Sequence, residues 1–144
     1  MTWKEPTDLE LKEIIGTAKN VAVIGASSDS SKPSYMVFQY LQSKTSFTLF
    51  PINPEEQSIS GVKAHGSLQE VPSQIDICVV FRRPEFMPEV FEDALSVNAK
   101  VLWMQLGIRN EVVAENATEK GMKVVQDRCI KIEHARLFNT GNSE

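Results

Sequence analysis

The chain has 144 residues, of which 42% are hydrophobic, and its formal net charge is −4. These values predict one globular domain over residues 1–144, with enough apolar side chains to form a core without disulfides or a metal. The negative charge and the absence of a basic stripe argue against a nucleic-acid-binding surface. Two cysteines, no apolar signal segment and no membrane-length run lead us to expect a cytoplasmic protein that does not contact a membrane.

The chain opens with a predicted helix and a predicted buried strand. Thr7 and Glu10 stand at capping-box spacing before apolar residues at helical intervals, which predicts a helix over residues 8–19. The short apolar run at 21–24 ends at Gly25 and is typical of a parallel strand that is buried on both faces.

A polar loop, a second helix and a second strand follow. Residues 26–32 are small and polar, and Pro33 suits the first position of a helix. Residues 47–52 are predicted to be the second strand. A loop is expected over residues 55–61, and residues 62–65 are predicted to form a short strand.

The middle of the chain is predicted to hold a turn, a strand and a helix. Ser67 is expected to cap a brief helical turn that ends before Pro72. Residues 75–81 form a strongly apolar run and are predicted to be a buried strand, and Pro84 is expected to begin the next helix.

The last part of the chain repeats the alternation. Residues 101–105 and 122–125 are predicted strands, and between them Asn110 is expected to cap a helix that runs to about residue 120. Residues 130–138 are predicted to form a closing helix before a polar tail. Alternating strands and helices predict an α/β fold, a Rossmann-like three-layer sandwich with a mainly parallel sheet. Trp103 and Met104 are expected to pack within it.

Ligands of open parallel sheets bind beyond the carboxyl ends of the strands, where the strand order reverses. The loops expected at that edge are residues 25–28, 52–54, 81–84 and 105–108. In the first of these loops, Gly25 and Ala26 allow the backbone to approach a ligand closely. Ser27 and Ser28 offer amides and hydroxyls, and Lys32 adds a positive charge beside a helix N-terminus. A tight turn is needed here in any parallel α/β protein, but this combination favours a bound phosphate.

The same region argues against a dinucleotide site. Only Gly25 of a G-x-G-x-x-G pattern is present, and Asn53-Pro54 follows the second strand where NAD-binding domains usually carry an acidic residue. The nearest acidic residues, Glu55 and Glu56, lie beyond the proline. An NAD(P)-linked oxidoreductase is therefore an alternative function, and the chain is short for a separate substrate domain.

A set of short motifs resembles a known family. The motifs are Val-Ile-Gly-Ala-Ser at 23–27, Ile-Asn-Pro at 52–54, Val-Phe-Arg-Arg-Pro at 80–84, Trp-Met-Gln-Leu-Gly-Ile at 103–108 and Asp-Arg-Cys-Ile-Lys-Ile-Glu-His at 127–134. In this order they resemble the small stand-alone CoA-binding proteins, which are similar to the CoA-binding Rossmann domain of succinyl-CoA synthetase. The resemblance covers a core of about residues 19–137. The synthetase-type domain has Thr-Glu-Gly where this chain has Gln105-Leu106-Gly107.

The resemblance implies that the chain binds coenzyme A or an acyl-CoA at the strand ends without catalysis of its own. It implies a diphosphate cradled by the backbone N–H groups of Gly25, Ala26 and Ser27 with Lys32 beside it, and an ADP end lined by Ile52, Asn53 and Pro54. Ser28 is also expected among the cofactor-binding residues. It further implies an adenine and phosphorylated ribose bordered by Phe81, Arg82 and Arg83, and it places Gln105, Gly107 and Ile108 beside the diphosphate or the start of the pantetheine arm. A Gly25→Val change is expected to block the phosphate turn, and Arg82→Ala to weaken binding without unfolding the protein.

The same residues also have purely structural interpretations. Arg82 and Arg83 could be solvated charges at a strand end, and Gln105 could satisfy loop backbone groups. Asn53-Pro54 favours a turn in any context.

Cys129 and His134 suggest a second alternative, a CoA-dependent thiol enzyme. Cys129 starts the predicted closing helix, a position that lowers a thiol pKa, and Asp127 and Glu133 are near in sequence. Because residues 129 and 134 do not share one helix face, we favour structural roles, in which the cysteine caps the helix and the histidine satisfies backbone groups. No CxxC, HxxxH or G-x-S-x-G pattern supports a metal site or a serine hydrolase.

Overall fold

The computed structural model describes residues 2–138, so Met1 and the polar tail predicted after residue 138 lie outside the described residues. The helices are α1 (Asp8–Thr17), α2 (Pro33–Lys44), α3 (Met87–Ser96), α4 (Glu111–Glu119) and α5 (Ile130–Phe138), with short 3₁₀ turns at Leu68–Glu70 and Pro84–Phe86. The strands are β1 (Asn20–Ile24), β2 (Thr48–Ile52), β3 (Ser58–Ile59), β4 (Val62–Lys63), β5 (Ile77–Val80), β6 (Val101–Met104) and β7 (Lys123–Val125).

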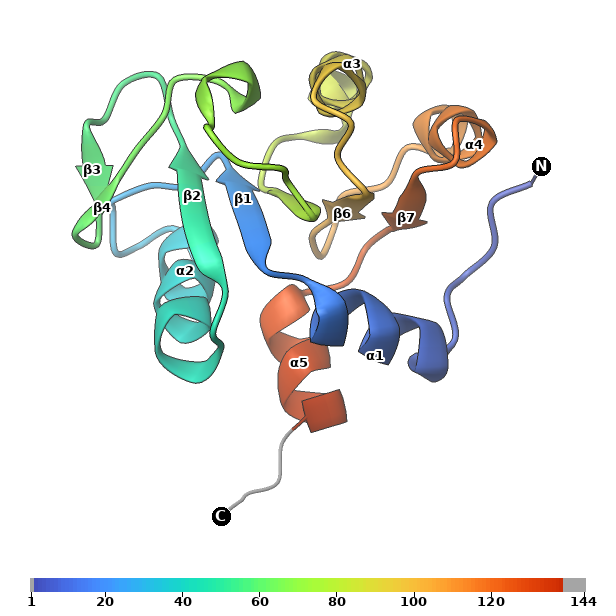
Figure 1. Ribbon diagram of the computed structural model, residues 1–144, viewed down its shortest axis with the longest axis horizontal. Helices are drawn as coiled ribbons and strands as arrows, with labels where there is room; N and C mark the ends of the chain where they lie inside the picture. Colours follow the sequence, from blue (N-terminus) through green and yellow to red (C-terminus); the bar gives the residue numbers. More distant parts are fainter. Residues whose placement is uncertain (1, 139–144) are drawn as a thin grey trace.

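The main sheet has five strands in the order β2-β1-β5-β6-β7, and every neighbouring pair is parallel (Figure 1). From β1 the chain first goes outward to β2 and then returns to add β5 on the other side of β1. The strand order therefore reverses between β1 and β5, which is where a parallel sheet opens a crevice at its carboxyl edge. This topology confirms the predicted Rossmann-like α/β fold.

Helices cover both faces of the sheet, as the sequence predicts. Along β1, Val21 and Val23 pack with α1, α2 and α5, whereas Ala22 and Ile24 pack with α3 and α4. This two-residue alternation recurs in β5 and β6, because successive side chains of a strand point to opposite faces. Both faces are apolar, so the central strands are continuous hydrophobic runs. The predicted packing of Trp103 and Met104 is confirmed, since both are fully buried.

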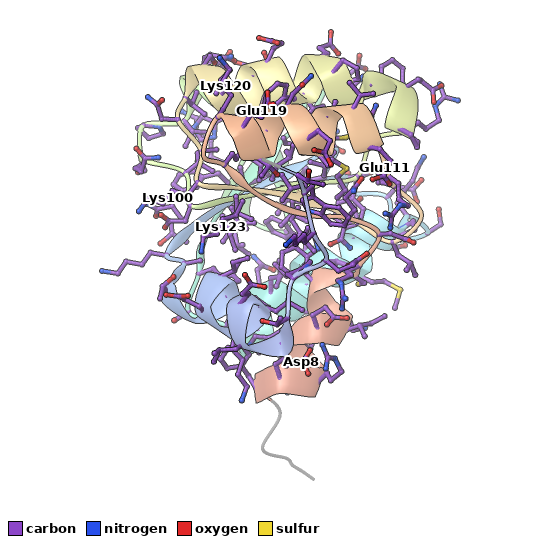
Figure 2. All side chains as sticks on the ribbon, turned by 90° about the vertical axis from the view of Figure 1, so that its right-hand side faces the viewer. Asp8, Lys100, Glu111, Glu119, Lys120 and Lys123 are labelled. Carbon is purple, nitrogen blue, oxygen red and sulfur yellow. The ribbon has the colours of Figure 1, made fainter. Side chains whose placement is uncertain are left out.

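Figure 2 shows the two ends of the sheet from the side of β7. Lys100 and Lys123 mark the amino ends of β6 and β7, and Lys120 follows the end of α4 on the same side. Glu111, the first residue of α4, lies at the opposite end, which is the carboxyl edge of the strands. Within residues 2–138, no helix is long and apolar enough to cross a membrane.

The predicted caps are confirmed at two helices. The Thr7 hydroxyl accepts the Glu10 N–H and the Glu10 carboxylate accepts the Thr7 N–H, which completes the capping box of α1. Asn110 Oδ1 accepts the Val113 N–H at the start of α4. Pro33 occupies the first turn of α2, and no side chain caps this helix.

Other local predictions need correction. The loop expected at 55–61 contains β3, which pairs antiparallel with β4 through Ser60 and Gly61, both at positive φ. Ser67 precedes its 3₁₀ turn, but its side chain makes no capping hydrogen bond. Pro84 begins a 3₁₀ turn, and the α-helix itself starts at Met87. Most strands are shorter than predicted by one to three residues. In β5, for example, Ile75 and Phe81 lie outside the paired positions Ile77–Val80.

Candidate functional site

Two neighbouring cavities open at the carboxyl edge of the sheet, on either side of the β1–β5 switch point. Their volumes are about 630 and 500 Å³, within the range of small-molecule pockets. Gly25, Asn53, Phe81, Arg82 and Arg83 line both of them. The larger cavity extends toward the N-terminus of α2 and the loop after β6, and the smaller one toward Pro54 and Ser67.

The predicted site residues converge on these cavities, with one exception. Gly25, Asn53, Phe81, Arg82 and Arg83 are shared, the larger cavity adds Ala26, Ser27, Lys32, Gln105, Gly107 and Ile108, and the smaller one adds Ile52 and Pro54. Ser28 lines neither cavity. Four loops far apart in sequence thus meet at one place because they follow adjacent parallel strands.

Gly25 allows β1 and β5 to come together at the switch point. Its φ is +84°, and a Cβ built on it would lie 2.7 Å from the Phe81 carbonyl oxygen. The Phe81 N–H in turn donates to the Ile24 carbonyl at 2.8 Å. A side chain at residue 25 would therefore strain the backbone and collide with the Phe81 carbonyl, directly after β5, before it reached any ligand. The predicted Gly25→Val experiment would consequently test folding rather than phosphate binding.

The first loop leads directly into the uncapped N-terminus of α2. Lys32 is the N-cap residue, and its side chain makes no capping hydrogen bond. Ser34, in the first turn, is 3% exposed and lines the larger cavity. Pro33 has no N–H, and the Tyr35 N–H donates to the Lys32 carbonyl at 3.0 Å. The Ser34 amide and the helix dipole therefore make this end favourable for an anion.

Ser28 is held away from the cavities by a carboxylate. Its N–H donates to Glu56 Oε2 at 3.0 Å, and its hydroxyl donates to Glu56 Oε1. These bonds hold the pKa of the Glu56 carboxyl below its usual value, with the hydroxyl bond as the largest cause. The exclusion of Ser28 could not be predicted, because its partner comes from the loop after β2.

Asn53 braces the first loop from the end of β2. Its Nδ2 donates to the Ala26 carbonyl at 2.9 Å, and its Oδ1 accepts the Glu55 N–H at 2.7 Å. The position that an acidic ribose ligand occupies in NAD-binding domains is thus filled by an amide that supports the backbone. This arrangement gives the NAD(P) alternative no added support.

Arg82 and Arg83 follow β5 at the junction of the cavities. The Arg82 guanidinium lies 4.3 Å from the centre of the Phe86 ring and 3.3 Å from a Glu89 oxygen. Arg83 lies 5.5 Å from the same ring and 3.5 Å from Glu85. The Arg82 side chain is 37% exposed and that of Arg83 is 75% exposed, so both can turn toward a ligand at small cost.

The loop after β6 is fastened to the segment before α5. The Gly107 N–H donates to Asp127 Oδ1 at 2.6 Å, and the Asp127 N–H donates to the Ile108 carbonyl at 3.1 Å. Gln105 Oε1 accepts the Ile130 N–H at 3.0 Å. The prediction that Gln105 could satisfy backbone groups is confirmed for its oxygen, although that backbone belongs to α5.

Cys129 and His134 do not form a nucleophile and base pair. His134 Nδ1 shares a 2.8 Å hydrogen bond with the Tyr40 hydroxyl, so the predicted backbone role of this histidine is wrong. Glu133 pairs with Arg128 and Arg136. Asp127 holds the Gly107 N–H, so neither acid orients a catalytic base. The Cys129 carbonyl accepts the Glu133 N–H at the start of α5, and the residue lines the larger cavity.

Some cavity residues were missed because helices, not strand-end loops, supply them. Ser34 and Val37 come from α2, and Ile132 comes from α5. The helical spacing of the apolar residues Val37 and Ile132 indicates only core packing, and Ser34 is a polar residue with no distinguishing pattern around it. A further cavity of about 470 Å³ lies at the amino ends of the strands beside Lys100 and Lys123, away from every predicted site residue. Among the residues that the structure describes, no cluster of His, Cys, Asp or Glu could hold a metal ion.

Comparison with known proteins identifies relatives over nearly the whole chain. The chain is 40% identical over 132 residues to YneT of Bacillus subtilis strain 168, covering 92% of this chain and 97% of that protein. A solved structure from Thermus thermophilus has a TM-score of 0.87 and 35% identity, and the match covers 92% of this chain and 100% of that one.

A second relative is much longer. The alpha subunit of ADP-forming acetate–CoA ligase II from Pyrococcus furiosus is 28% identical over 134 residues, a match that covers 85% of this chain but only 29% of that subunit. The chain is therefore homologous to one part of that ligase subunit. A family model described as a CoA binding domain matches residues 19–135. The chain belongs to the CoA binding domain family.

Proposed function

We propose that this protein binds coenzyme A or an acyl-CoA in the two cavities at the carboxyl ends of β1, β5 and β6, with the whole chain acting as one binding domain. The observation that carries the proposal is that the uncapped α2 N-terminus, Lys32, Arg82 and Arg83 open onto the same cavity. Backbone amides and cations in that arrangement favour a bound diphosphate.

Each part of the cofactor has residues of matching chemistry. The diphosphate is assigned to the amides of Ala26 and Ser27 beside Lys32. The predicted role of the Gly25 amide needs correction, because its N–H already donates to the Ile52 carbonyl at 3.1 Å. The ADP end is assigned to Ile52, Asn53 and Pro54, which flank the smaller cavity. The adenine and phosphorylated ribose are assigned to Phe81, Arg82 and Arg83, because a guanidinium can stack on a ring or pair with phosphate oxygens. The pantetheine arm begins beside Gln105, Gly107 and Ile108.

Membership of the CoA binding domain family and homology to part of an acetate–CoA ligase subunit support this choice of cofactor. We propose binding without catalysis by this chain, since His134 Nδ1 is hydrogen-bonded to Tyr40 and the Asp127 carboxylate to the Gly107 N–H rather than to a catalytic pair with Cys129. The cytoplasmic location remains a prediction from the sequence.

Isothermal titration of the full chain with CoA and, separately, with NADH tests the proposal. We expect saturable CoA binding and no comparable NADH binding. Arg82→Ala should weaken CoA binding by about 10- to 100-fold, the loss typical of one charge-assisted contact. Arg109→Ala is the matched control, because this arginine also pairs with acidic residues and lies over an aromatic ring but lines neither cavity. Preferential NADH binding would reverse the assignment.

A further inference from the structure

Gln105 is a buried polar residue in the wall of the larger cavity. The residue is 3% exposed and lies immediately after β6. Its Oε1 accepts the Ile130 N–H at 3.0 Å. Because a backbone N–H can only donate, this bond fixes the amide with its oxygen toward α5 and its NH₂ group directed away from it.

The Gln105 NH₂ group has no hydrogen-bond acceptor within residues 2–138. In the same part of the chain, His65 Nδ1 is the sole fully enclosed side-chain polar atom that lacks a partner. Gln105 Nε2 is therefore not sealed in the core and reaches the cavity surface. Leaving a donor unpaired in a largely buried side chain costs free energy. A ligand acceptor in the cavity that bonds to this atom would therefore be favoured.

The other buried glutamine provides a contrast. Gln126 is 1% exposed, and its Oε1 accepts the Asn110 N–H at 2.8 Å. Its Nε2 donates to Glu111 Oε1 at 3.4 Å, so both ends of this amide have partners inside the protein. Gln105 alone of the two keeps a donor for the cavity.

The surroundings of Gln105 favour a neutral acceptor over a phosphate. The Gly107 N–H is already bonded to the Asp127 carboxylate, which adds negative charge at the end of β6. The cations of the site follow β1 and β5, whereas Gln105 follows β6, one strand farther along the sheet. Val37, Leu106, Ile108 and Ile132 supply apolar surface in the same cavity. A single fixed N–H donor among apolar side chains suits a carbonyl oxygen carried on a largely apolar chain of the ligand.

We propose that Gln105 Nε2 recognises a carbonyl oxygen of the cofactor arm, either a pantetheine amide or an acyl thioester, and thereby selects pantetheine-bearing ligands over the bare nucleotide. This inference rests on the proposed function and assigns a ligand group to one atom of the site. The oxygen of the same side chain acts separately, as the anchor of α5.

Gln105→Glu isolates the donor. A carboxylate keeps an oxygen for the Ile130 N–H but replaces the NH₂ group with a second acceptor. Wild type and variant are titrated with three ligands. CoA carries the pantetheine amides, acetyl-CoA carries these amides and a thioester, and adenosine 3′,5′-bisphosphate carries neither group. Gln126→Glu serves as the control for a buried Gln→Glu change outside the cavities.

We expect Gln105→Glu to weaken acetyl-CoA binding by about tenfold, and CoA binding equally if the recognised carbonyl is a pantetheine amide, with less than about a twofold change for the bisphosphate. Equal losses for CoA and acetyl-CoA identify a pantetheine amide, and a loss confined to acetyl-CoA identifies the thioester. Equal losses for all three ligands would mean charge repulsion of the phosphates and would overturn the inference. Unchanged affinities would overturn it too while leaving the proposed function intact, whereas no binding of CoA or bisphosphate by wild type would overturn both.

A second readout needs no substitution. In the wild-type protein, the side-chain NH₂ resonances of Gln105 should shift on addition of acetyl-CoA, and of CoA as well if a pantetheine amide is recognised, while those of Gln126 stay in place. The bisphosphate should leave both sets unmoved. A Gln105 amide that does not respond to CoA or acetyl-CoA at saturation would contradict the proposal even if the Glu variant failed to fold.

Discussion

The Gly25 Cα and the Phe81 carbonyl approach so closely that a Cβ on residue 25 would lie 2.7 Å from that oxygen. Gly25→Ala should therefore destabilise the fold by more than the strain of its positive φ alone. Gly107 is the matched control, because its φ is +85° but nothing lies within 4 Å of its Cβ position. We expect Gly107→Ala to cost about 1–2 kcal/mol and Gly25→Ala distinctly more, measured by urea unfolding. Equal losses of unfolding free energy in the two variants would show that the Phe81 backbone moves to make room for a Cβ at residue 25.

Glu56 places a negative charge beside the proposed diphosphate loop through its bonds to Ser28. Its lowered pKa keeps it ionised at neutral pH. Glu56→Gln should strengthen CoA binding by about two- to fivefold at low salt, and less at high salt, because screening removes the repulsion. Glu55→Gln, next in sequence, is the control for an exposed acid of the same loop. Weaker binding by Glu56→Gln would instead mean that this carboxylate holds the loop in its binding form.

The two cysteines should differ sharply in reactivity. Cys78 is fully buried in β5, and burial raises its pKa to about 12. Cys129 is partly exposed and lines the larger cavity. Iodoacetamide at neutral pH should therefore modify Cys129 and spare Cys78 in the native protein, and saturating CoA should slow the modification of Cys129.

Peptide mass spectrometry measures both sites, with urea-unfolded protein as the control in which both react. Modification of Cys129 at the same rate with and without CoA would place the cofactor away from α5.

His134 should make stability depend on pH in a defined direction. Burial lowers its pKa below the usual value of 6.5, so the folded state disfavours the charged ring. The unfolded chain then binds more protons, and stability should fall as the pH drops through 6.5 toward the folded pKa and then level off.

His134→Asn keeps a polar partner for Tyr40 and should lose less stability than wild type between about pH 7.5 and 5.5 in urea titrations. Identical pH dependence in the two proteins would show that other groups cause the loss.

The sheet could be predicted from the sequence because its strands are buried on both faces. Residues 75–81 and 101–105 are apolar at every position or nearly so, and such runs remain recognisable without any partner. The β3–β4 hairpin was missed because two-residue strands are too short to show an alternating pattern. The Ser60-Gly61 pair is the local sequence feature that fits a hairpin turn, and in the structure both residues have positive φ.

The strand-end loops of the candidate site could also be predicted, since parallel strands bring their carboxyl ends to one edge. What each side chain does there could not. Ser28 is bonded to Glu56 from the loop after β2, and Gln105 is oriented by Ile130 at the start of α5, so both partners are distant in sequence. Such contacts depend on how loops fold back in three dimensions, which a pattern along the chain does not encode.

A crystal structure of the protein grown with CoA tests the central claim most directly. The account predicts the diphosphate within hydrogen-bond distance of the amides of Ala26 and Ser27 or of the Ser34 amide in the first turn of α2, with Arg82 or Arg83 beside the adenine or ribose phosphate. CoA bound at the amino ends of the strands, or absent while the β1–β5 crevice stays empty, would contradict it.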